Sequence, residues 1–204
     1  RVYGSTEVPV MTVGVIGDVM HAADTDGQPG IAHIKIAGTN GGSADSGEVL
    51  AKGPQMLVGY SHAEDEAGAF DAEGYFRTGD LGRWMDDNYL VIVGRAKDII
   101  IRHGENIAPK EVEDLLINHP DIAEIAIVGL PDPKTGERAC AVIVAKGLAK
   151  PKVTDLADFL VAKGVAKFKF PEQVVIWNAL PKNDAGKVLK HKIRSTLIET
   201  PAES

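Results

Sequence analysis

The residues with the clearest capacity for chemistry lie near the two ends of the chain. Residues 3–7 bring the aromatic ring of Tyr3, the hydroxyls of Ser5 and Thr6 and the carboxylate of Glu7 close together. An aromatic ring can stack on a purine, a hydroxyl can donate a hydrogen bond to a phosphate oxygen, and a carboxylate can hold Mg²⁺. Taken alone, however, this short segment is better explained as an ordinary turn.

The second such segment surrounds Lys187. Basic residues predominate over residues 182–194, although the formal net charge of the whole chain is −7. A basic loop in an acidic protein suits an anionic ligand, while a solvated tail is the simpler explanation of the segment in isolation. Gly186-Lys187 does not form a P-loop motif, because Pro181 stands where that motif needs its first glycine and Val188 where it needs Ser or Thr.

Three residues between these ends also have chemical potential. Asp80 follows a glycine and could accept hydrogen bonds from a ribose diol at a strand end. Arg95 could donate its forked hydrogen bonds to ribose or phosphate oxygens. Gly104 lies in a tight turn, where the missing side chain would let a thin ligand pass close to the backbone. Ordinary surface turns would explain each of these residues as well.

The elements that must position these residues differ between two portions of the chain. Up to residue 95 we expect short strands and turns, including strands at 31–37 and 89–93 and a surface loop or short helix at 60–74. Residues 95–98 form a polar joint. Beyond it we expect strands at 99–101, 122–128, 139–145 and 173–177 and helices at 109–119, 153–163 and 191–198. The fold class is therefore α+β, with a β-rich first portion and a small sheet covered by helices in the second.

Composition excludes several classes of protein. An acidic chain is a poor candidate for general nucleic-acid binding. The sequence has no apolar run near the roughly 20 residues of a membrane span, and its first residues do not resemble the basic-then-apolar pattern expected of a signal peptide. The single cysteine, Cys140, sits in an apolar segment and is expected to be buried and structural, which fits a reducing cytoplasm. The six histidines show no metal-ligand spacing.

The order and spacing of the motifs are far more specific than any one of them. In sequence they are Tyr-Gly-Ser-Thr-Glu at 3–7, Tyr-Phe-Arg-Thr-Gly-Asp at 75–80, Gly-Arg-Ala-Lys-Asp-Ile-Ile at 94–100, Gly-Glu-Asn-Ile at 104–107 and Pro-Lys-Asn-Asp-Ala-Gly-Lys at 181–187. This series resembles the adenylate-forming superfamily of acyl-CoA synthetases, peptide-synthetase adenylation domains and luciferases. The resemblance covers nearly the whole chain.

The resemblance implies a two-step reaction. A carboxylic acid and ATP give an acyl-adenylate and pyrophosphate, and the thiol of coenzyme A then gives the thioester and AMP. In this family Tyr3 would stack on adenine, Thr6 would contact phosphate and Glu7 would hold Mg²⁺. Asp80 and Arg95 would bind the ribose.

The remaining implied roles concern a mobile C-terminal domain. Lys97 would be the hinge about which this domain rotates between half-reactions, and Gly104 would line the passage for pantetheine. Lys187 would reach the substrate carboxylate and the α-phosphate, where a placed ammonium lowers the cost of bringing two anions together. His103 stands where many acyl-CoA synthetases have glycine, which could narrow the passage for coenzyme A.

The resemblance also predicts the domain organisation. Residues 1–96 would be the end of the large AMP-binding domain, mostly its β-barrel-like subdomain, and residues 97–204 the complete small mobile domain. The family's phosphate loop and most of its acyl pocket are absent from this sequence, which begins with Arg1. We therefore expect a fragment that is inactive without the missing N-terminal portion, with residues 1–12 disordered or mispaired.

The parent is predicted to be an acid:CoA ligase for a fatty or related acid, acting in the cytoplasm. A CoA ligase is preferred because no carrier-protein segment follows the Lys187 motif. An adenylation domain that loads a carrier protein and a non-catalytic nucleotide-binding module remain as alternatives. The sequence does not identify the acid, and fatty, alicyclic and aromatic acids all stay open.

Overall fold

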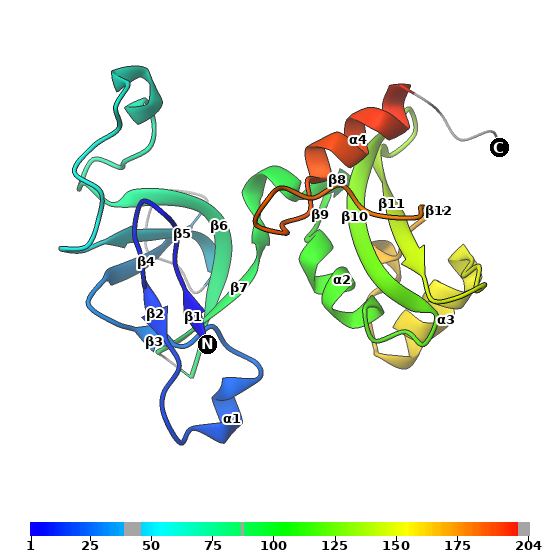
Figure 1. Ribbon diagram of the computed structural model, residues 1–204, viewed down its shortest axis with the longest axis horizontal. Coiled ribbons are helices and arrows are strands. Elements are labelled where there is room, and N and C mark those ends of the chain that lie inside the picture. Colours follow the sequence, from blue (N-terminus) through cyan, green and yellow to red (C-terminus); the bar gives the residue numbers. More distant parts are fainter. Residues whose placement is uncertain (39–45, 87, 200–204) are drawn as a thin grey trace. The chain divides into compact units, whose positions relative to one another are not determined.

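The computed structural model describes residues 1–38, 46–86 and 88–199 (Figure 1). The chain divides into two compact units, Arg1–Lys97 and Asp98–Ser204. The division falls inside the polar joint expected at 95–98. The first unit is rich in strands and the second mixes strands with helices, so the predicted α+β fold class is confirmed.

Unit 1, as far as it is described, contains two antiparallel sheets. The first has three short strands in the order β1-β2-β3, and the second is a four-stranded meander in the order β4-β5-β6-β7. The strands are β1 Val2–Tyr3, β2 Thr12–Val13, β3 Gln28–Pro29, β4 His33–Ala37, β5 Ser46–Lys52, β6 Phe76–Met85 and β7 Tyr89–Arg95. The connections carry helix α1, Val19–Ala22, and the 3₁₀ turn Ala63–Glu66, within the segment predicted as a loop or short helix.

The beginning of the chain contributes to the core of unit 1. Val8 and Met11 are fully buried and form a cluster with Ala51 of β5 and Phe76 of β6. Burying two such side chains stabilises the unit by several kcal/mol, of order ~1.5–3 kcal/mol each. The first of the two alternatives expected for residues 1–12, disorder, is therefore wrong, because apolar side chains at positions 8 and 11 pack this segment against the neighbouring sheet. The other alternative, mispairing of its strands, stays a prediction.

The hairpin β6–β7 sets two charged residues opposite each other. Asp80 pairs with Arg95 in the ladder, next to a register shift between Leu81 and Gly82. Residues directly opposite on antiparallel strands project their side chains to the same face. Asp80 lies within β6, which continues to Met85, so its predicted position at a strand end is wrong. Gly79, with φ +69°, and the register shift let the ladder continue past this point.

Unit 2, over its described residues, is built on a five-stranded sheet in the order β10-β11-β8-β9, with β12 pairing in parallel with β11. The strands are β8 Ile100–Arg102, β9 Glu105–Ile107, β10 Ile122–Asp132, β11 Gly136–Ala145 and β12 Gln173–Ile176. The helices are α2 Pro109–Leu116, α3 Val153–Ala162 and α4 Lys190–Glu199, and 3₁₀ turns occupy Ala96–Asp98 and Lys167–Lys169.

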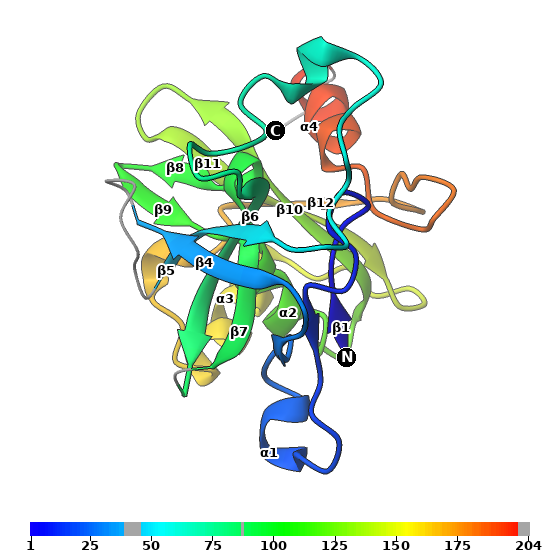
Figure 2. The same ribbon diagram turned by 90° about the vertical axis from the view of Figure 1, so that its left-hand side faces the viewer.

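Helices cover this sheet on both faces. On one face, Leu116 of α2 and Leu156 of α3 pack with Ile127 of β10. On the other, Ile193 and Leu197 of α4 belong to a separate cluster that includes Val142 of β11. Figures 1 and 2 both show α4 apart from α2 and α3. Strands buried on both faces have nearly continuous apolar sequences, which explains the composition of β10 and β11.

The strands β10 and β11 are longer than predicted. They extend to a short turn in which Asp132 Oδ1 accepts hydrogen bonds from the backbone N–H groups of Lys134 and Thr135, at 2.9 and 3.0 Å. Gly136, at φ +84°, then starts β11. The predicted final helix at 191–198 is confirmed as α4 with one more residue at each end. Of the described helices, none is long and apolar enough to cross a membrane.

Cys140 lies in the centre of this unit. Its side chain is fully buried in β11, and burial raises the pKa of its thiol to about 12. The thiol therefore stays protonated at neutral pH and unreactive while the unit is folded. The prediction of a buried, structural cysteine is confirmed.

Candidate functional site

Three of the predicted site residues come together in unit 1. Tyr3 Oη donates a hydrogen bond to Asp80 Oδ2 at 2.8 Å, and Arg95 Nε donates one to Asp80 Oδ1, also at 2.8 Å. The Asp80 side chain is only 14% exposed, whereas that of Arg95 is 36% exposed. These contacts join strands β1, β6 and β7, and we call the three residues the Tyr3–Asp80–Arg95 cluster.

The surroundings of Tyr3 keep its hydroxyl protonated. Burial, followed by the negative charge of Asp80, raises the pKa of Tyr3 well above its usual range, so its hydroxyl remains a donor. A carboxylate has about four acceptor sites, and this cluster uses one on each oxygen of Asp80. Asp80 can therefore be held in place by protein groups and still accept further hydrogen bonds from a ligand.

Thr78 holds the backbone of Asp80 against strand β5. Its hydroxyl donates to the carbonyl oxygen of Val49 at 2.7 Å and accepts from the backbone N–H of Asp80 at 3.0 Å. The sequence motif included Thr78, but reasoning from residue types assigned it no role. Its contact partner on β5 is 29 residues away in sequence and could not be read from local spacing.

Thr6 and Glu7 lie at the tip of a turn closed by Ser5 and Val8. The backbone N–H of Ser5 donates to the carbonyl oxygen of Val8, and Ser5 Oγ accepts from the N–H of Val8, each at 3.1 Å. Thr6 is exposed and Glu7 is half-buried. Tyr60 Oη donates a long hydrogen bond to Glu7 Oε1, at 3.4 Å.

Partial burial and the neighbouring Glu7 carboxylate raise the pKa of Tyr60, which keeps it a donor. Tyr60 is a neighbour of the predicted site that sequence reasoning missed, because 53 residues separate it from Glu7. The arrangement leaves the second carboxylate oxygen of Glu7 without a hydrogen bond among the described residues. A carboxylate in this state suits a hard cation that also binds substrate phosphates.

Lys187 lies in unit 2, on an exposed loop between the buried Leu180 and helix α4. Asn183 Oδ1 accepts a hydrogen bond from the backbone N–H of Lys187 at 2.8 Å. The Lys187 side chain itself makes no hydrogen bond or ion pair within residues 98–199 or with any other described residue. The loop thus presents an unpaired ammonium group to solvent.

Gly104 occupies the turn of the β8–β9 hairpin together with His103. Both residues have positive φ, +81° for Gly104 and +51° for His103. A two-residue hairpin with both residues in the left-handed region is a type I′ turn, which favours Asn or Gly at the first position. A Cβ placed on Gly104 would meet no described atom within 4 Å, so the space beside it is open.

A groove of ≈ 510 Å³ adjoins this turn within unit 2. Val153 and Ala157 of α3 and the Phe168 side chain give it apolar walls, and Arg102 and His103 lie on its hairpin side. Arg102 is held in place because its guanidinium donates to the Phe168 carbonyl oxygen at 2.9 Å and to Glu172 Oε1 at 2.7 Å.

Lys97 is exposed in the 3₁₀ turn Ala96–Asp98, and the division between the two units falls directly after it. Lys97 is therefore the last residue of unit 1. Of the remaining predicted site residues, Tyr3, Thr6, Glu7, Asp80 and Arg95 belong to unit 1, whereas Gly104 and Lys187 belong to unit 2.

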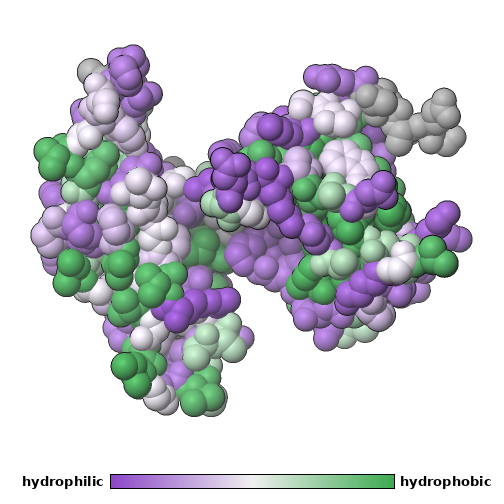
Figure 3. All heavy atoms as spheres, viewed as in Figure 1, coloured by the Kyte–Doolittle hydropathy of each residue, from purple (hydrophilic) through white to green (hydrophobic). Residues whose placement is uncertain are grey.

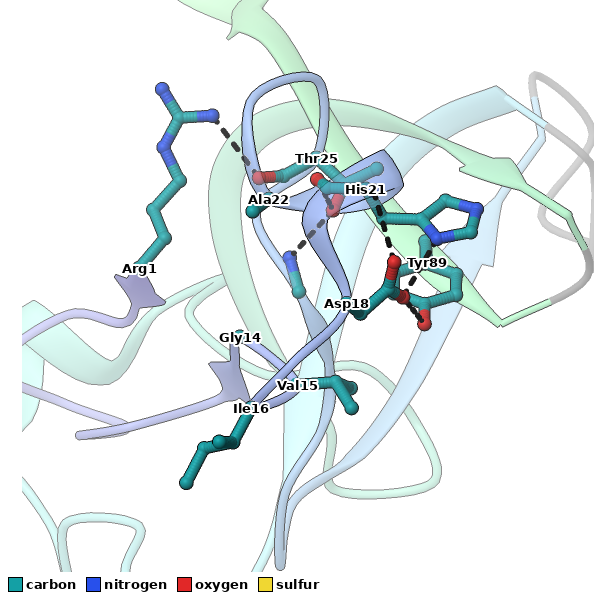
Figure 4. A pocket seen from close by; sticks show the side chains of 10 residues that line it. Arg1, Gly14, Val15, Ile16, Asp18, His21, Ala22, Thr25 and Tyr89 are labelled. Atoms are coloured by element: carbon teal, nitrogen blue, oxygen red, sulfur yellow. Dashed lines mark hydrogen bonds and ion pairs between the residues drawn. The ribbon is translucent and has the colours of Figure 1, made fainter.

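A pocket that sequence reasoning did not find lies at the α1 end of unit 1, with a volume of ≈ 250 Å³ (Figure 4). His21 Nδ1 lies 2.7 Å from Asp18 Oδ2, and its Nε2 lies 2.9 Å from Asp86 Oδ2. The ring of Tyr89 stacks on His21 and its hydroxyl donates to Asp18. Figure 4 shows Asp18, His21 and Tyr89 grouped on one side and Arg1 on the other.

The hydrogen bonds from His21 to Asp86 and then Asp18 raise the pKa of the imidazole. The spacing of Asp18 and His21 is that of an N-cap side chain and the backbone donor three residues later, and Asp18 Oδ1 does accept a hydrogen bond from the His21 N–H at 3.2 Å. Their link to Tyr89 has no local sequence signal. Apolar residues of this end, including Ile16, Val19 and Met20, are largely exposed, and Figure 3 shows hydrophobic residues on its visible face. Searching the described residues finds no group of three or more potential metal ligands.

Comparison with known proteins adds an independent finding. Residues 111–187 match the family described as the AMP-binding enzyme C-terminal domain. The chain is 36% identical over 204 residues to the medium-chain fatty-acid–CoA ligase of Escherichia coli (strain K12), covering 97% of this chain and 36% of that protein. It is 39% identical over 200 residues to a salicyl-AMP ligase / salicyl-S-ArCP synthetase of Mycobacterium tuberculosis (strain ATCC 25618 / H37Rv), covering 95% of this chain and 35% of that protein.

Among solved structures, ATP-bound MatB from Rhodopseudomonas palustris is similar with a TM-score of 0.86 and 31% sequence identity. The match covers 96% of this chain and 40% of that chain. The present chain thus spans little more than a third of the length of the two relatives.

Proposed function

Because this chain belongs to the adenylate-forming superfamily, as the C-terminal portion of one of its enzymes, we propose that the full-length protein is an ATP-dependent carboxylic acid:CoA ligase. The observation that carries this proposal is the Tyr3–Asp80–Arg95 cluster. It holds a mostly buried carboxylate with acceptor sites to spare, next to an aromatic ring and a guanidinium. A nucleoside has a purine and a vicinal diol that match these groups.

In the first half-reaction, Tyr3 stacks on adenine while Asp80 and Arg95 bind the ribose. Thr6, exposed at its turn, donates to a phosphate oxygen, and Glu7 would hold Mg²⁺. Mg²⁺ is commonly bound through one or two protein carboxylates together with substrate phosphates, so a single half-buried Glu7 fits the ion, which would supply neutralisation of phosphate charge when bound. The role of this chain is to orient the nucleotide for attack at the α-phosphorus.

Lys187 acts on the same step. An oxygen of the acid's carboxylate attacks the α-phosphorus, and the bond from this phosphorus to the pyrophosphate oxygen breaks. Both reactants are anionic, so an ammonium close to the carboxylate and the α-phosphoryl oxygens lowers the repulsion and stabilises the transition state. An exposed Lys187 without an internal ion pair is available for this role.

In the second half-reaction, the coenzyme A thiol attacks the carbonyl carbon of the acyl-adenylate, AMP leaves, and the thiol proton is lost. We assign residues 1–96 to the end of the large AMP-binding domain and residues 97–204 to the small mobile domain, with Lys97 as hinge. The open space beside Gly104 and the groove next to it support a route for pantetheine past the hairpin. A cytoplasmic location is proposed, since the one cysteine is unpaired.

A second candidate is an adenylation enzyme that loads a carrier protein. It is favoured by the 39% identity to a relative whose name includes both an AMP ligase and an S-ArCP synthetase. The two candidates share the first half-reaction and differ in the thiol that accepts the acyl group. A non-catalytic nucleotide-binding module is the third, and it predicts ATP binding without turnover.

The test is acid-dependent ATP–pyrophosphate exchange by the full-length protein, with octanoate, cyclohexanecarboxylate, benzoate and salicylate as the panel. Exchange with any acid supports adenylation, and the 204-residue chain assayed alone should show none. AMP release is then measured with coenzyme A or with a phosphopantetheinylated aryl carrier protein. Release with coenzyme A supports the ligase. Release with the carrier alone supports the second candidate, and ATP binding without exchange supports the third.

A further inference from the structure

Three backbone hydrogen bonds close the loop that carries Lys187. The backbone N–H of Leu189 donates to the carbonyl oxygen of Pro181 at 2.8 Å, and that of Asn183 donates to the carbonyl oxygen of Lys187 at 3.0 Å. Gly186, at φ +78°, makes the reversal and donates its N–H to the carbonyl oxygen of Asn183 at 2.8 Å. The loop is therefore a small folded unit rather than a loose tail.

The ends of this loop are attached to the body of unit 2. Lys182 pairs with Glu124 of β10, and Lys190, the first residue of α4, pairs with Glu113 of α2, each at 2.7 Å. The Lys182 pair is well exposed and contributes little, whereas the Lys190 pair is largely shielded, with side chains 20% and 16% exposed. The Lys190 pair therefore fixes the start of α4 to α2, three residues after Lys187.

Within this framework one side chain contacts Lys187 directly. Asn183 Oδ1 accepts from the Lys187 backbone N–H at 2.8 Å, and the Asn183 N–H donates to the Lys187 carbonyl oxygen. Both backbone polar groups of Lys187 are thus bonded to a single residue. Asn183 is itself exposed, so its side chain is not needed for packing in the core.

We propose that Asn183 is a positioning residue for Lys187 in the adenylation half-reaction. This inference rests on the proposed role of Lys187. A lysine side chain loses rotamer entropy when it is held at its target, and motion of its backbone would add to that cost. By fixing the Lys187 backbone, Asn183 reduces the number of orientations from which the ammonium must find the α-phosphate, which is the kind of contribution that orientation makes to rate.

The test uses the full-length protein and two separate readouts. The first is kcat and KM for ATP in acid-dependent ATP–pyrophosphate exchange, with the acid from the panel that supports it. The second is thioester formation from the purified acyl-adenylate of that acid and coenzyme A, which bypasses the step assigned to Lys187. The variants are Asn183→Ala, Asn183→Asp and Lys187→Ala. Asp184→Ala is the matched control, because Asp184 is an exposed polar neighbour without a hydrogen bond among the described residues.

We expect Asn183→Ala to lower kcat for exchange by about 5- to 20-fold, the effect of one lost hydrogen bond that acts through orientation. KM for ATP and thioester formation from the acyl-adenylate should stay within about twofold. Asn183→Asp keeps the acceptor oxygen and should recover most of the rate. Asp184→Ala should behave as the wild type in both readouts.

The outcomes separate the inference from the proposed function. Normal exchange by Asn183→Ala, together with loss of exchange by Lys187→Ala, would overturn the positioning role alone. Equal loss in both half-reactions would indicate general damage to the loop and would also overturn it. Absence of exchange from the wild type, or full exchange by Lys187→Ala, would overturn the proposed function and this inference with it.

Discussion

The Tyr3–Asp80–Arg95 cluster in unit 1 and the Lys187 loop in unit 2 differ in how their polar side chains are hydrogen-bonded. In the cluster every functional side chain is bonded to another one, and the contacts join strands up to 77 residues apart in sequence. In the loop the contacts are local and involve the backbone, while the Lys187 side chain is exposed. Under the proposed function, the cluster would hold a ligand in place and the loop would present a charged group to one.

This comparison has a physical reason. A binding carboxylate gains from a fixed orientation, and its neighbours can provide it while leaving acceptor sites open. A cation that must contact a substrate only during one step would lose from an internal ion pair, since that pair would have to break first. Local backbone hydrogen bonds position such a residue without neutralising its charge.

The largest effect is expected from Lys187→Ala. Removing one group that stabilises charge in a transition state costs roughly 10²- to 10³-fold in rate. Adenylation by the full-length protein should therefore fall by about that factor, with thioester formation from the acyl-adenylate almost unchanged. ATP–pyrophosphate exchange and a thioester assay measure the two. An equal fall in both would show that Lys187 is not specific to one step.

Asp80→Asn should produce the next largest effect by opening the cluster. It removes the charge that faces Arg95 and disturbs the acceptor for the Tyr3 hydroxyl. We expect the apparent Kd for ATP to rise about 10- to 100-fold and the free energy of unfolding to fall by about 1–3 kcal/mol. Isothermal calorimetry on the full-length protein and urea unfolding check these values. Unchanged ATP affinity would remove the cluster from the nucleotide site.

Tyr3→Phe separates the hydroxyl from the ring. The aromatic ring that would stack on adenine remains, and only the hydrogen bond to Asp80 is lost. A single hydrogen bond contributes about 1 kcal/mol, so KM for ATP should rise about fivefold with little change in kcat. Tyr3→Leu is the matched variant that also loses the ring, and its KM should rise further. Identical behaviour of the two variants would argue against stacking.

His103→Asn tests the conformation of the β8–β9 turn in unit 2. Asn adopts the left-handed conformation at lower cost, so the β8–β9 turn should be stabilised by about 0.5 kcal/mol. Gly104→Ala should have the opposite effect, about 1 kcal/mol or more, because its φ is also positive. Urea unfolding of the 204-residue chain in a Trp84→Phe background, where Trp177 is the remaining tryptophan, reports on unit 2. A destabilised His103→Asn variant would contradict the turn geometry.

The smallest effect should come from pH acting through His21. Its pKa is raised in the folded state by Asp86 and Asp18. Protonated His21 therefore stabilises the folded state. This contribution to the free energy of unfolding is complete below the unfolded pKa of about 6.5 and is lost as pH rises through the higher folded pKa. Unfolding of the 204-residue chain in a Trp177→Phe background, followed by Trp84, should show this loss above pH 6.5. His21→Asn should remove that dependence, and a dependence that persists would place it elsewhere.

Much of the fold could be predicted because local patterns determine it. The strands of the β10–β11 hairpin have apolar runs, and the final helix places Ile193 and Leu197 four residues apart, so their existence was predicted and only their ends shifted. The two strands are longer than predicted because Asp132 and Gly136 form a tight turn between them. Asp132 accepts hydrogen bonds from residues two and three positions later, and Gly136 adopts the positive φ that the turn needs. Local signals of this kind are visible in a sequence.

The contacts within the candidate site could not be predicted in the same way. The link from Tyr3 to Asp80 and that from Tyr60 to Glu7 depend on strand pairing and loop placement over more than 50 residues. The resemblance gave Tyr3 and Asp80 separate roles but did not suggest that they bond each other. Residues 1–12 were expected to be disordered or mispaired because the sheet that they would join lies outside this sequence. That expectation left out the burial of Val8 and Met11 within this chain.

Because of its position, Cys140 can report the opening of unit 2. The chain has one thiol, and it is fully buried in β11 with a pKa of about 12, so a thiol reagent can react only when this strand opens. The rate of labelling at Cys140 then measures the population of opened molecules, without any added probe. Unit 1 has no cysteine, so the signal belongs to one half of the chain. A ligand that binds folded unit 2 would slow this labelling as its occupancy rises, so the proposed binding of coenzyme A to this unit can be tested without any added probe.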